Sequence, residues 1–258
     1  MDRHIKPLKR TGLTFERYRA TAQSSFASFP NEQVWRQGGL TPNRQLEKPE
    51  AGYCIVLRYD QETTGAITHF MAKIRAILPP IVEYHERHLH TTIGVYGKGD
   101  LAGFLPDPPT IKCLRQSIEA GLGSCAQNLQ VALGKWLFNN ETILIPGYPN
   151  QNLWALTQSI GHACALNGLA LDMARMAHVT TARFISGVSR QVFEQFVGLT
   201  KSAPVIGSVR PSSIDLATWR CDGLTFELAT HRRYPLGAKA FQARTDTVGE
   251  HDNNLPQK

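Results

Sequence analysis

The order of the predicted elements along the chain is the feature that most constrains its fold. An apolar strand and a helix precede a Thr-rich strand at residues 88–97, and a helix and a strand pair follow it. A similar order begins again with a helix, a second Thr-rich strand at residues 177–185, another helix and further strands. This repetition indicates a duplicated α+β unit.

Hydrophobic periodicity and turn residues place the other elements of this unit. Strands are predicted at residues 52–59, 129–138, 142–146, 205–209, 214–220 and 224–228. Helices are predicted at residues 14–28, 60–78, 110–120, 152–167 and 189–199.

The two ends of the chain differ in composition from its middle. The first residues are basic, and residues 30–49 are rich in Gln, Asn, Pro and Gly, whereas the last residues are polar. We therefore expect an N-terminal extension at residues 1–50, a domain of two repeats at 51–240 and a polar tail at 241–258.

Each Thr-rich strand carries a histidine and, two residues later, a threonine: His90 and Thr92 in the first, His178 and Thr180 in the second. Residues i and i+2 of a strand point to the same side, about 6–7 Å apart. Because histidine titrates near neutral pH, one ring can act as base while the other acts as acid. Threonine hydroxyls can donate to phosphate oxygens and stabilise charge there. If the two strands lie side by side, this set is sufficient for phosphodiester chemistry without a metal.

As bare tripeptides, the two motifs carry little weight, because such tripeptides arise by chance in a chain with nine histidines. Their context carries more. Both lie inside apolar, β-prone segments, at equivalent points of the repeated order of elements. We therefore interpret the pairs as two halves of one active site.

The two segments resemble the motifs of the 2H phosphoesterase superfamily, which includes 2′-5′ RNA ligase-like proteins and cyclic phosphodiesterases. Residues 90–97 (HTTIGVYG) are similar to the first motif, in which His-x-Thr-Leu precedes a short apolar run and a glycine. Residues 178–183 (HVTTAR) resemble the second, where an arginine often falls at the same offset. The resemblance covers roughly residues 50–235, and Thr181 stands where an aliphatic residue is usual.

The resemblance implies a bilobal α+β fold, with a central cleft between two pseudo-symmetric antiparallel sheets and with flanking helices. It implies that His90 and His178 share the acid and base roles and that Thr92 and Thr180 hold the phosphate. The implied activity is hydrolysis of 2′,3′-cyclic, 2′-5′-linked or cyclic oligonucleotide phosphodiesters, with no cofactor. The alternative is a non-catalytic module of the same fold that binds RNA or nucleotides.

Three more residues are candidates for binding the substrate. Tyr96 and Phe184 have the strand parity of the histidines, so each either stacks on a base or packs in the core. The resemblance places Arg183 against phosphate, although strict alternation points it away from His178 unless a bulge intervenes. Lys98 and residues 231–234 (HRRY) either add positive charge to this site or lie on solvated surface.

A metal-dependent hydrolase built on His85, His88 and His90 is a third hypothesis, because His-x-His on a strand puts two rings on one face. No third ligand with convincing spacing follows this pair, so we predict no metal site.

The net charge of +7 favours an anionic partner, and a nucleotide or RNA substrate fits it. No apolar stretch approaches the roughly 18 residues of a spanning helix, and no secretory signal is recognisable at the N-terminus. The five cysteines form no CxxC pair. We expect a cytoplasmic monomer without a membrane partner.

Overall fold

The computed structural model describes residues 14–43, 48–79, 81–123 and 128–236, and the structural statements below concern these residues. The predicted polar tail and residues 1–13 of the predicted extension lie outside them. The helices are α1 (Phe15–Ala27), η1 (Asn31–Gln37), α2 (Gln61–Arg75), η3 (Glu86–His88), α3 (Pro108–Leu122), α4 (Gln151–Leu166) and α5 (Arg190–Lys201). The strands are β1 (Glu50–Arg58), β2 (Ile81–Glu83), β3 (Thr91–Asp100), β4 (Val131–Leu133), β5 (Leu137–Phe138), β6 (Thr142–Pro149), β7 (Asp172–Met173), β8 (His178–Phe184), β9 (Gly207–Val209), β10 (Ser213–Cys221) and β11 (Phe226–Pro235).

The five α-helices begin where the sequence supplies a capping side chain. In each, the residue before the helix accepts a hydrogen bond from the backbone N–H three positions on, which satisfies one of the unpaired donors of the first turn. These capping residues are Thr14, Asp60, Asp107, Asn150 and Ser189.

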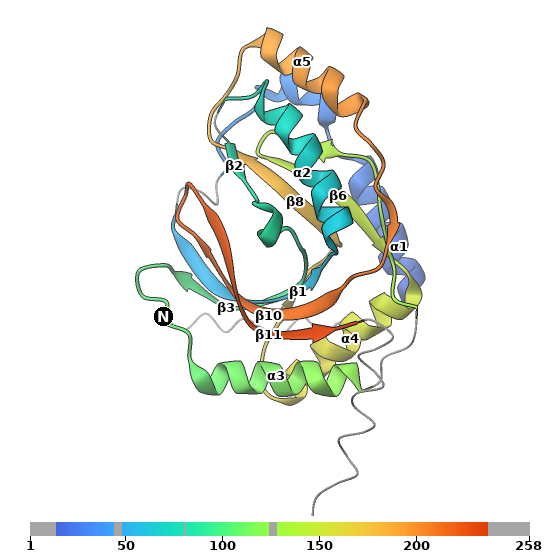
Figure 1. Ribbon diagram of the computed structural model, residues 1–258, viewed down its shortest axis with the longest axis vertical. Helices are drawn as coiled ribbons and strands as arrows, with labels where there is room; N and C mark the ends of the chain where they lie inside the picture. Colours follow the sequence, from blue (N-terminus) through green and yellow to red (C-terminus); the bar gives the residue numbers. More distant parts are fainter. Residues whose placement is uncertain (1–13, 44–47, 80, 124–127, 237–258) are drawn as a thin grey trace, which may run out of the picture.

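All strand pairs in the described part of the chain are antiparallel, and they form one curled sheet (Figure 1). Its main path runs in the order β11-β10-β1-β3-β8-β6-β4-β9. The short strands β2, β5 and β7 are added to β8, β6 and β3. The α+β class predicted from the sequence is confirmed.

The two halves of the chain join where β3 pairs with β8, with Thr91 opposite Val179. This ladder makes the sheet continuous, so the expectation of two separate pseudo-symmetric sheets is wrong. The physical reason is that the inner edge strand of each half carries backbone groups that need partners, and the two edges satisfy one another.

Helices cover the two halves of the sheet in pairs. α3 and α4 lie below β1, β3, β10 and β11, whereas α2 and α5 lie beside β6 and β8 (Figure 1). α3 and α4 approach closely, because Gly121 lies against Ile160 with no room for a Cβ. On the other half, Phe196 of α5 packs on Phe138, with ring centroids 4.7 Å apart.

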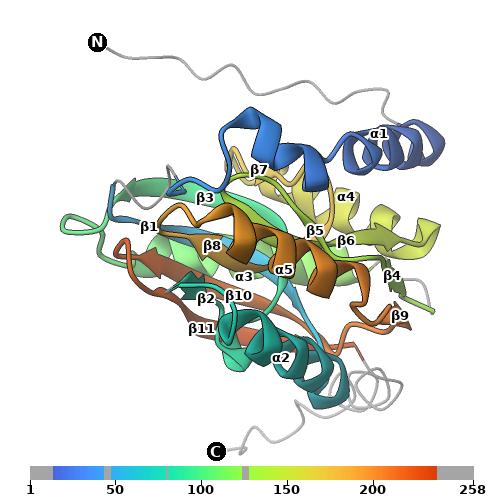
Figure 2. The ribbon, with the colours of Figure 1, turned by 90° about the horizontal axis from the view of Figure 1, so that it is seen from above.

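The first helix, within the predicted extension, packs against the domain beside α4 (Figure 2). Its buried residues Tyr18, Ala22 and Phe26 face inward. The ring of Tyr18 lies 6.3 Å from that of Trp154 on α4, and the ring of Phe26 lies 5.6 Å from that of Tyr148 on β6. None of the helices described here is long and apolar enough to cross a membrane.

Candidate active site

The pairing of β3 with β8 sets the geometry of the candidate site. Because the strands are antiparallel and Thr91 lies opposite Val179, the next residues place His90 across from Thr180 and Thr92 across from His178. All four side chains point to the same face of the sheet, opposite to Thr91 and Val179. Directly opposed residues have Cβ atoms about 4.5–5.5 Å apart. The structure therefore brings the four predicted residues together around a local two-fold axis.

The two histidines are held in the same way. His90 Nδ1 lies 2.7 Å from the carbonyl oxygen of His88, and His178 Nδ1 lies 3.2 Å from that of Met176. In both cases the carbonyl belongs to the residue two positions earlier. Because a carbonyl oxygen only accepts, Nδ1 of each neutral ring carries the proton and Nε2 keeps its lone pair. Nε2 is then the atom that can take up or release a proton.

Burial keeps both rings in the neutral form. His90 is 8% exposed, and the Phe226 ring stacks on it at 5.6 Å between centroids. Burial lowers the pKa of His90 to about 4, with smaller contributions from Arg58 and His178. Burial also lowers the pKa of His178, and the charge of Arg183 adds to this effect. At neutral pH both rings are therefore bases.

The motif threonines differ from their neighbours in hydrogen bonding. The buried Thr91 hydroxyl lies 2.7 Å from the Tyr59 hydroxyl, and the buried Thr181 hydroxyl donates to the carbonyl of Ile143. Thr92 and Thr180 are half-buried, and within the described residues their hydroxyls make no hydrogen bond. These two hydroxyls can therefore donate to a ligand.

Each motif strand contains a bulge just after its threonine. The pairing of β3 with β1 skips Ile93, and the pairing of β8 with β6 skips Thr181. A bulge reverses the alternation of faces beyond it. As a result, Arg183 returns to the face of His178, while Tyr96 and Phe184 turn to the opposite face.

The predicted aromatic contacts therefore do not lie where strict alternation puts them. Tyr96 pairs with Tyr53 on the core face, with ring centroids 6.3 Å apart. Phe184 is 1% exposed and packs against Phe196. Neither ring offers a surface to a ligand beside the histidines. The aromatic side chains that do lie there, Tyr84 and Phe226, were missed, because neither is near a motif in the sequence.

Arg183 is fixed by two side chains from distant segments. Its Nε donates to the Tyr84 hydroxyl at 2.8 Å, and its NH1 donates to Asn43 Oδ1 at 3.1 Å. The Tyr84 ring stacks on Phe226 at 4.3 Å and lies 6.3 Å from the His90 ring. Tyr84 thus connects both halves of the site. No motif signals Tyr84 or Asn43, since only the tertiary fold brings them to Arg183.

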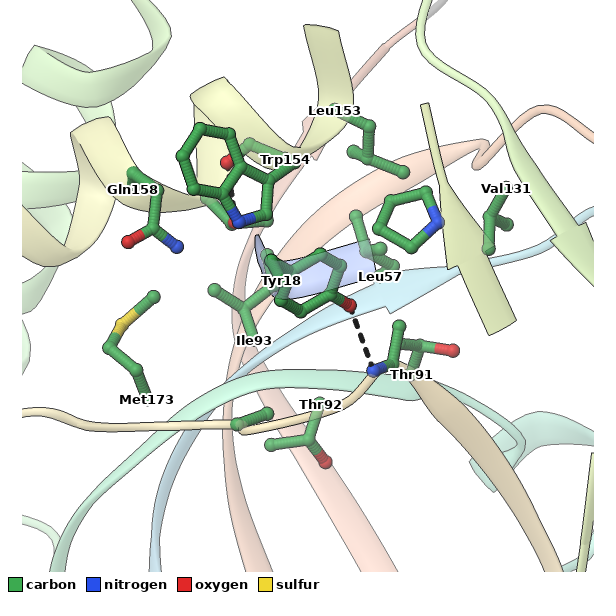
Figure 3. A pocket seen from close by; sticks show the side chains of 14 residues that line it. Tyr18, Leu57, Thr91, Thr92, Ile93, Val131, Leu153, Trp154, Gln158 and Met173 are labelled. Carbon is green, nitrogen blue, oxygen red and sulfur yellow. Dashed lines mark hydrogen bonds between the residues drawn. The ribbon is translucent and has the colours of Figure 1, made fainter. Parts of the chain in front are cut away.

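Residues of the predicted extension support the second motif from two sides. Asn43 is buried and holds Arg183, and its backbone N–H donates to the carbonyl of Phe184. On the other side, the N–H of Ala177, next to His178, donates to the Tyr18 hydroxyl at 3.2 Å. Tyr18 also lines a small cavity of about 30 Å³ beside β3 (Figure 3). These contacts make the described part of the extension a support for the site.

The remaining candidates lie apart from the four motif residues. Lys98 forms an ion pair with Glu50 at 2.7 Å. Residues 231–234 lie on β11, where His231 and Arg232 are exposed, Arg233 binds Asp215 and Tyr234 is buried.

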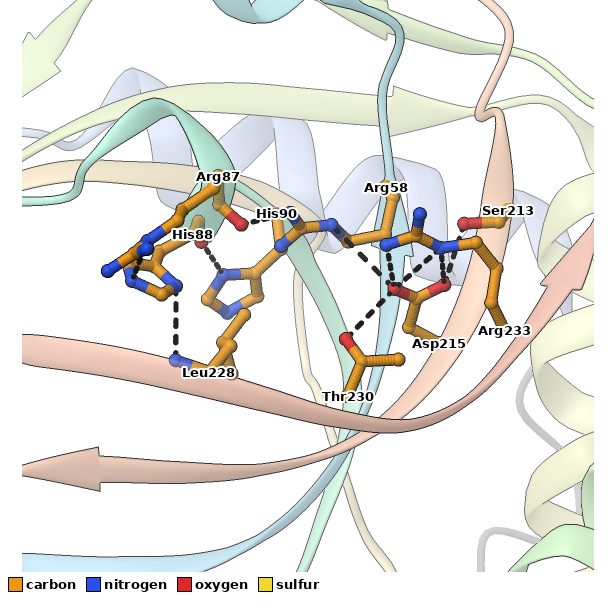
Figure 4. A network of polar contacts seen from close by, with 9 residues as sticks. All are labelled: Arg58, Arg87, His88, His90, Ser213, Asp215, Leu228, Thr230 and Arg233. Atoms are coloured by element: carbon orange, nitrogen blue, oxygen red, sulfur yellow. Dashed lines mark hydrogen bonds and ion pairs between the residues drawn. The ribbon is translucent and has the colours of Figure 1, made fainter.

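The three histidines of the metal hypothesis have separate partners, and Figure 4 shows those of His88 and His90. The His88 ring lies between the backbone N–H of Leu228, 3.1 Å from Nδ1, and Nε of Arg87, 3.1 Å from Nε2. His85 Nδ1 accepts from the backbone N–H of Arg87. Across the described ranges, no group of three His, Cys, Asp or Glu side chains is arranged to hold a metal ion.

Comparison with known proteins gives the fold. No protein-family model matches the sequence, and no curated protein matches it. Among solved structures, E. coli LigT complexed with NADP+ matches with a TM-score of 0.51 and 15% identity, over 73% of this chain and 99% of LigT. E. coli LigT in apo form matches with a TM-score of 0.50 and 15% identity, over 72% of this chain and 98% of LigT. The chain therefore has a fold similar to that of LigT.

The lowered pKa of His90 predicts how this ring and the fold respond to acid. The ring should titrate near pH 4 in the folded protein, whereas an unfolded histidine titrates at about 6.5. The unfolded state then binds more protons between these values, so the free energy of unfolding falls as the pH drops from about 6.5 towards 4. NMR titration of the His90 ring measures the pKa directly. A value of 6 or higher would contradict this account, and the His90→Asn variant should show a shallower decline of stability.

Proposed function

We propose that this chain is a phosphodiesterase of the 2H type, in which His90 and His178 act as acid and base. The observation that carries the proposal is the pairing of Thr91 with Val179, since the two His/Thr pairs then lie side by side on one face of the sheet. Their fixed Nδ1 protons direct both Nε2 atoms to the ligand side. A phosphate between the two rings meets a proton-transfer group on each side.

The proposed reaction is an in-line displacement at phosphorus. One imidazole Nε2 takes the proton from the attacking water as the new P–O bond forms. The other imidazole takes up a proton on Nε2 when the negatively charged phosphate binds beside it, and it gives this proton to the leaving oxygen as the old P–O bond breaks. The hydroxyls of Thr92 and Thr180 and the guanidinium of Arg183 donate to the non-bridging oxygens, where negative charge accumulates. The low pKa of the rings favours the base form before each turnover.

The proposed substrates are 2′,3′-cyclic, 2′-5′-linked or cyclic oligonucleotide phosphodiesters. The net charge of +7 supports an anionic substrate, and a solved structure of LigT, which has the same fold, holds NADP+. The two histidines supply both proton transfers, and two hydroxyls with Arg183 supply the charge stabilisation. We therefore propose that the reaction needs no metal ion.

Removing either imidazole should remove one proton transfer. We expect His90→Ala and His178→Ala each to lower kcat by about 10²- to 10⁴-fold on a substrate that the wild type hydrolyses. The activity of the wild type should survive treatment with EDTA. His69→Ala, which changes an exposed histidine of α2 outside the proposed pair, is the matched control for the loss of an imidazole. Full activity in His90→Ala, or loss of wild-type activity in EDTA, would refute the mechanism. Binding of RNA without hydrolysis would favour the non-catalytic module.

Thr91 and Thr92 are adjacent on β3, but we expect Thr92 to contribute to catalysis and Thr91 to stability. Thr92→Val removes a hydroxyl that makes no hydrogen bond within the described residues. We therefore expect kcat to fall by about 10²-fold while the thermal midpoint stays near that of the wild type. Thr91→Val removes the partner of the buried Tyr59 hydroxyl, so stability should fall by about 1–3 kcal/mol while the folded enzyme keeps its activity. Steady-state kinetics and thermal unfolding measure the two effects. Equal effects of both variants on kcat would show that Thr92 has no special role.

A further inference from the structure

A second pocket with a surplus of positive charge lies next to His90. It has a volume of about 400 Å³ and is formed by η3, the end of β1 and the strands β10 and β11. Four arginines line it: Arg58, Arg87, Arg220 and Arg233. Glu227 is the one acidic side chain among the lining residues that the structure describes.

Two of these arginines neutralise a buried carboxylate. Asp215 is 0% exposed, and Arg233 binds it with N–O distances of 2.9–3.2 Å. Arg58 lies 4.0 Å from the same carboxylate and donates to the carbonyl of Arg87 (Figure 4). One carboxylate thus faces two guanidinium groups, so the three groups together carry a net positive charge.

The other two arginines are available to a ligand. Arg87 and Arg220 are exposed, and within the described residues neither forms an ion pair with a carboxylate. Guanidinium groups bind phosphate oxygens through two parallel hydrogen bonds, so a pocket lined by several of them suits a phosphate group. His88 in its wall is neutral at pH 7, since burial and Arg87 lower its pKa to about 4.

The pocket and the candidate active site share a wall. The His88 carbonyl, which fixes Nδ1 of His90, belongs to a residue that lines the pocket. Arg58 lowers the pKa of His90 through its charge, and its side chain points to the same face of β1 as Val56, which pairs with Thr92. Figure 4 shows His90 between His88 and Arg58. The pocket therefore borders the candidate active site at His88 and Arg58.

We propose that this pocket, which we call the arginine pocket, binds a second phosphate of the substrate. The substrate class is then an oligonucleotide whose neighbouring phosphate binds between Arg87 and Arg220 while the scissile phosphate lies between His90 and His178. A mononucleotide with a single cyclic phosphate fills only the histidine site. This inference rests on the proposed function for its kinetic consequences, whereas the binding of phosphate by the pocket does not.

The kinetic test compares two substrates with the same scissile group, a 2′,3′-cyclic mononucleotide and a dinucleotide that ends in the same 2′,3′-cyclic phosphate. The wild type should have a kcat/KM at least tenfold higher for the dinucleotide. The double variant Arg87→Gln/Arg220→Gln should lose about tenfold in kcat/KM on the dinucleotide. On the mononucleotide its kcat/KM should fall by about twofold or less. Its dependence of log kcat/KM on log salt should be shallower by about 1 per arginine that contacts phosphate.

Arg232→Gln is the matched control, because Arg232 is exposed on β11 but does not line the pocket. It removes one positive charge near the pocket and should leave the preference for the dinucleotide unchanged. Arg58 and Arg233 are unsuitable targets, since their loss leaves a buried carboxylate without its partners. Equal losses on both substrates in the double variant, or a loss of preference in Arg232→Gln, would overturn the proposal.

Binding of inorganic pyrophosphate, measured by calorimetry, separates this inference from the proposed function. The wild type and His90→Ala/His178→Ala should both bind it, and Arg87→Gln/Arg220→Gln should bind at least tenfold more weakly. This binding result would support the pocket even if no substrate is hydrolysed. The absence of hydrolysis would refute only the proposed phosphodiesterase activity. Equal binding by the wild type and the arginine variant would overturn the pocket whatever the activity.

Discussion

The antiparallel pairing of Thr91 with Val179 is the contact on which the candidate site depends. It joins the two halves of the sheet and places His90 opposite Thr180 and Thr92 opposite His178. A shift of this register by one residue would turn one pair to the core face. The buried partners on that face, Val179 and the bonded hydroxyls of Thr91 and Tyr59, hold the register in place.

The sequence predicted most of the elements but not the way in which the halves join. Long periodic segments such as α2, β1 and β10 were predicted because their apolar spacing is unambiguous. The segment 129–138 was predicted as one strand, yet it divides into β4 and β5, because a bulge interrupts its pairing with β6. Strands β2 and β7 span three and two residues, which is too short for any periodic signal.

The same limit applies to the site. The spacing of two residues predicted that each motif histidine shares a face with its threonine, because a regular strand extends over each His-x-Thr. Beyond Ile93 and Thr181 the bulges reverse the faces, so Arg183 could be placed only if a bulge was allowed, and the two aromatic candidates were placed on the wrong side. The groups that hold Arg183 come from far along the chain, Asn43 and Tyr84, and only packing brings them together.

A crystal structure with vanadate, a mimic of a phosphate in transfer, tests the central claim most directly. The account predicts vanadate between the Nε2 atoms of His90 and His178, with the hydroxyls of Thr92 and Thr180 donating to its equatorial oxygens. Arg183 should contact the ion without leaving Tyr84 and Asn43. Vanadate bound elsewhere, or bound here without contact to either histidine, would contradict the account.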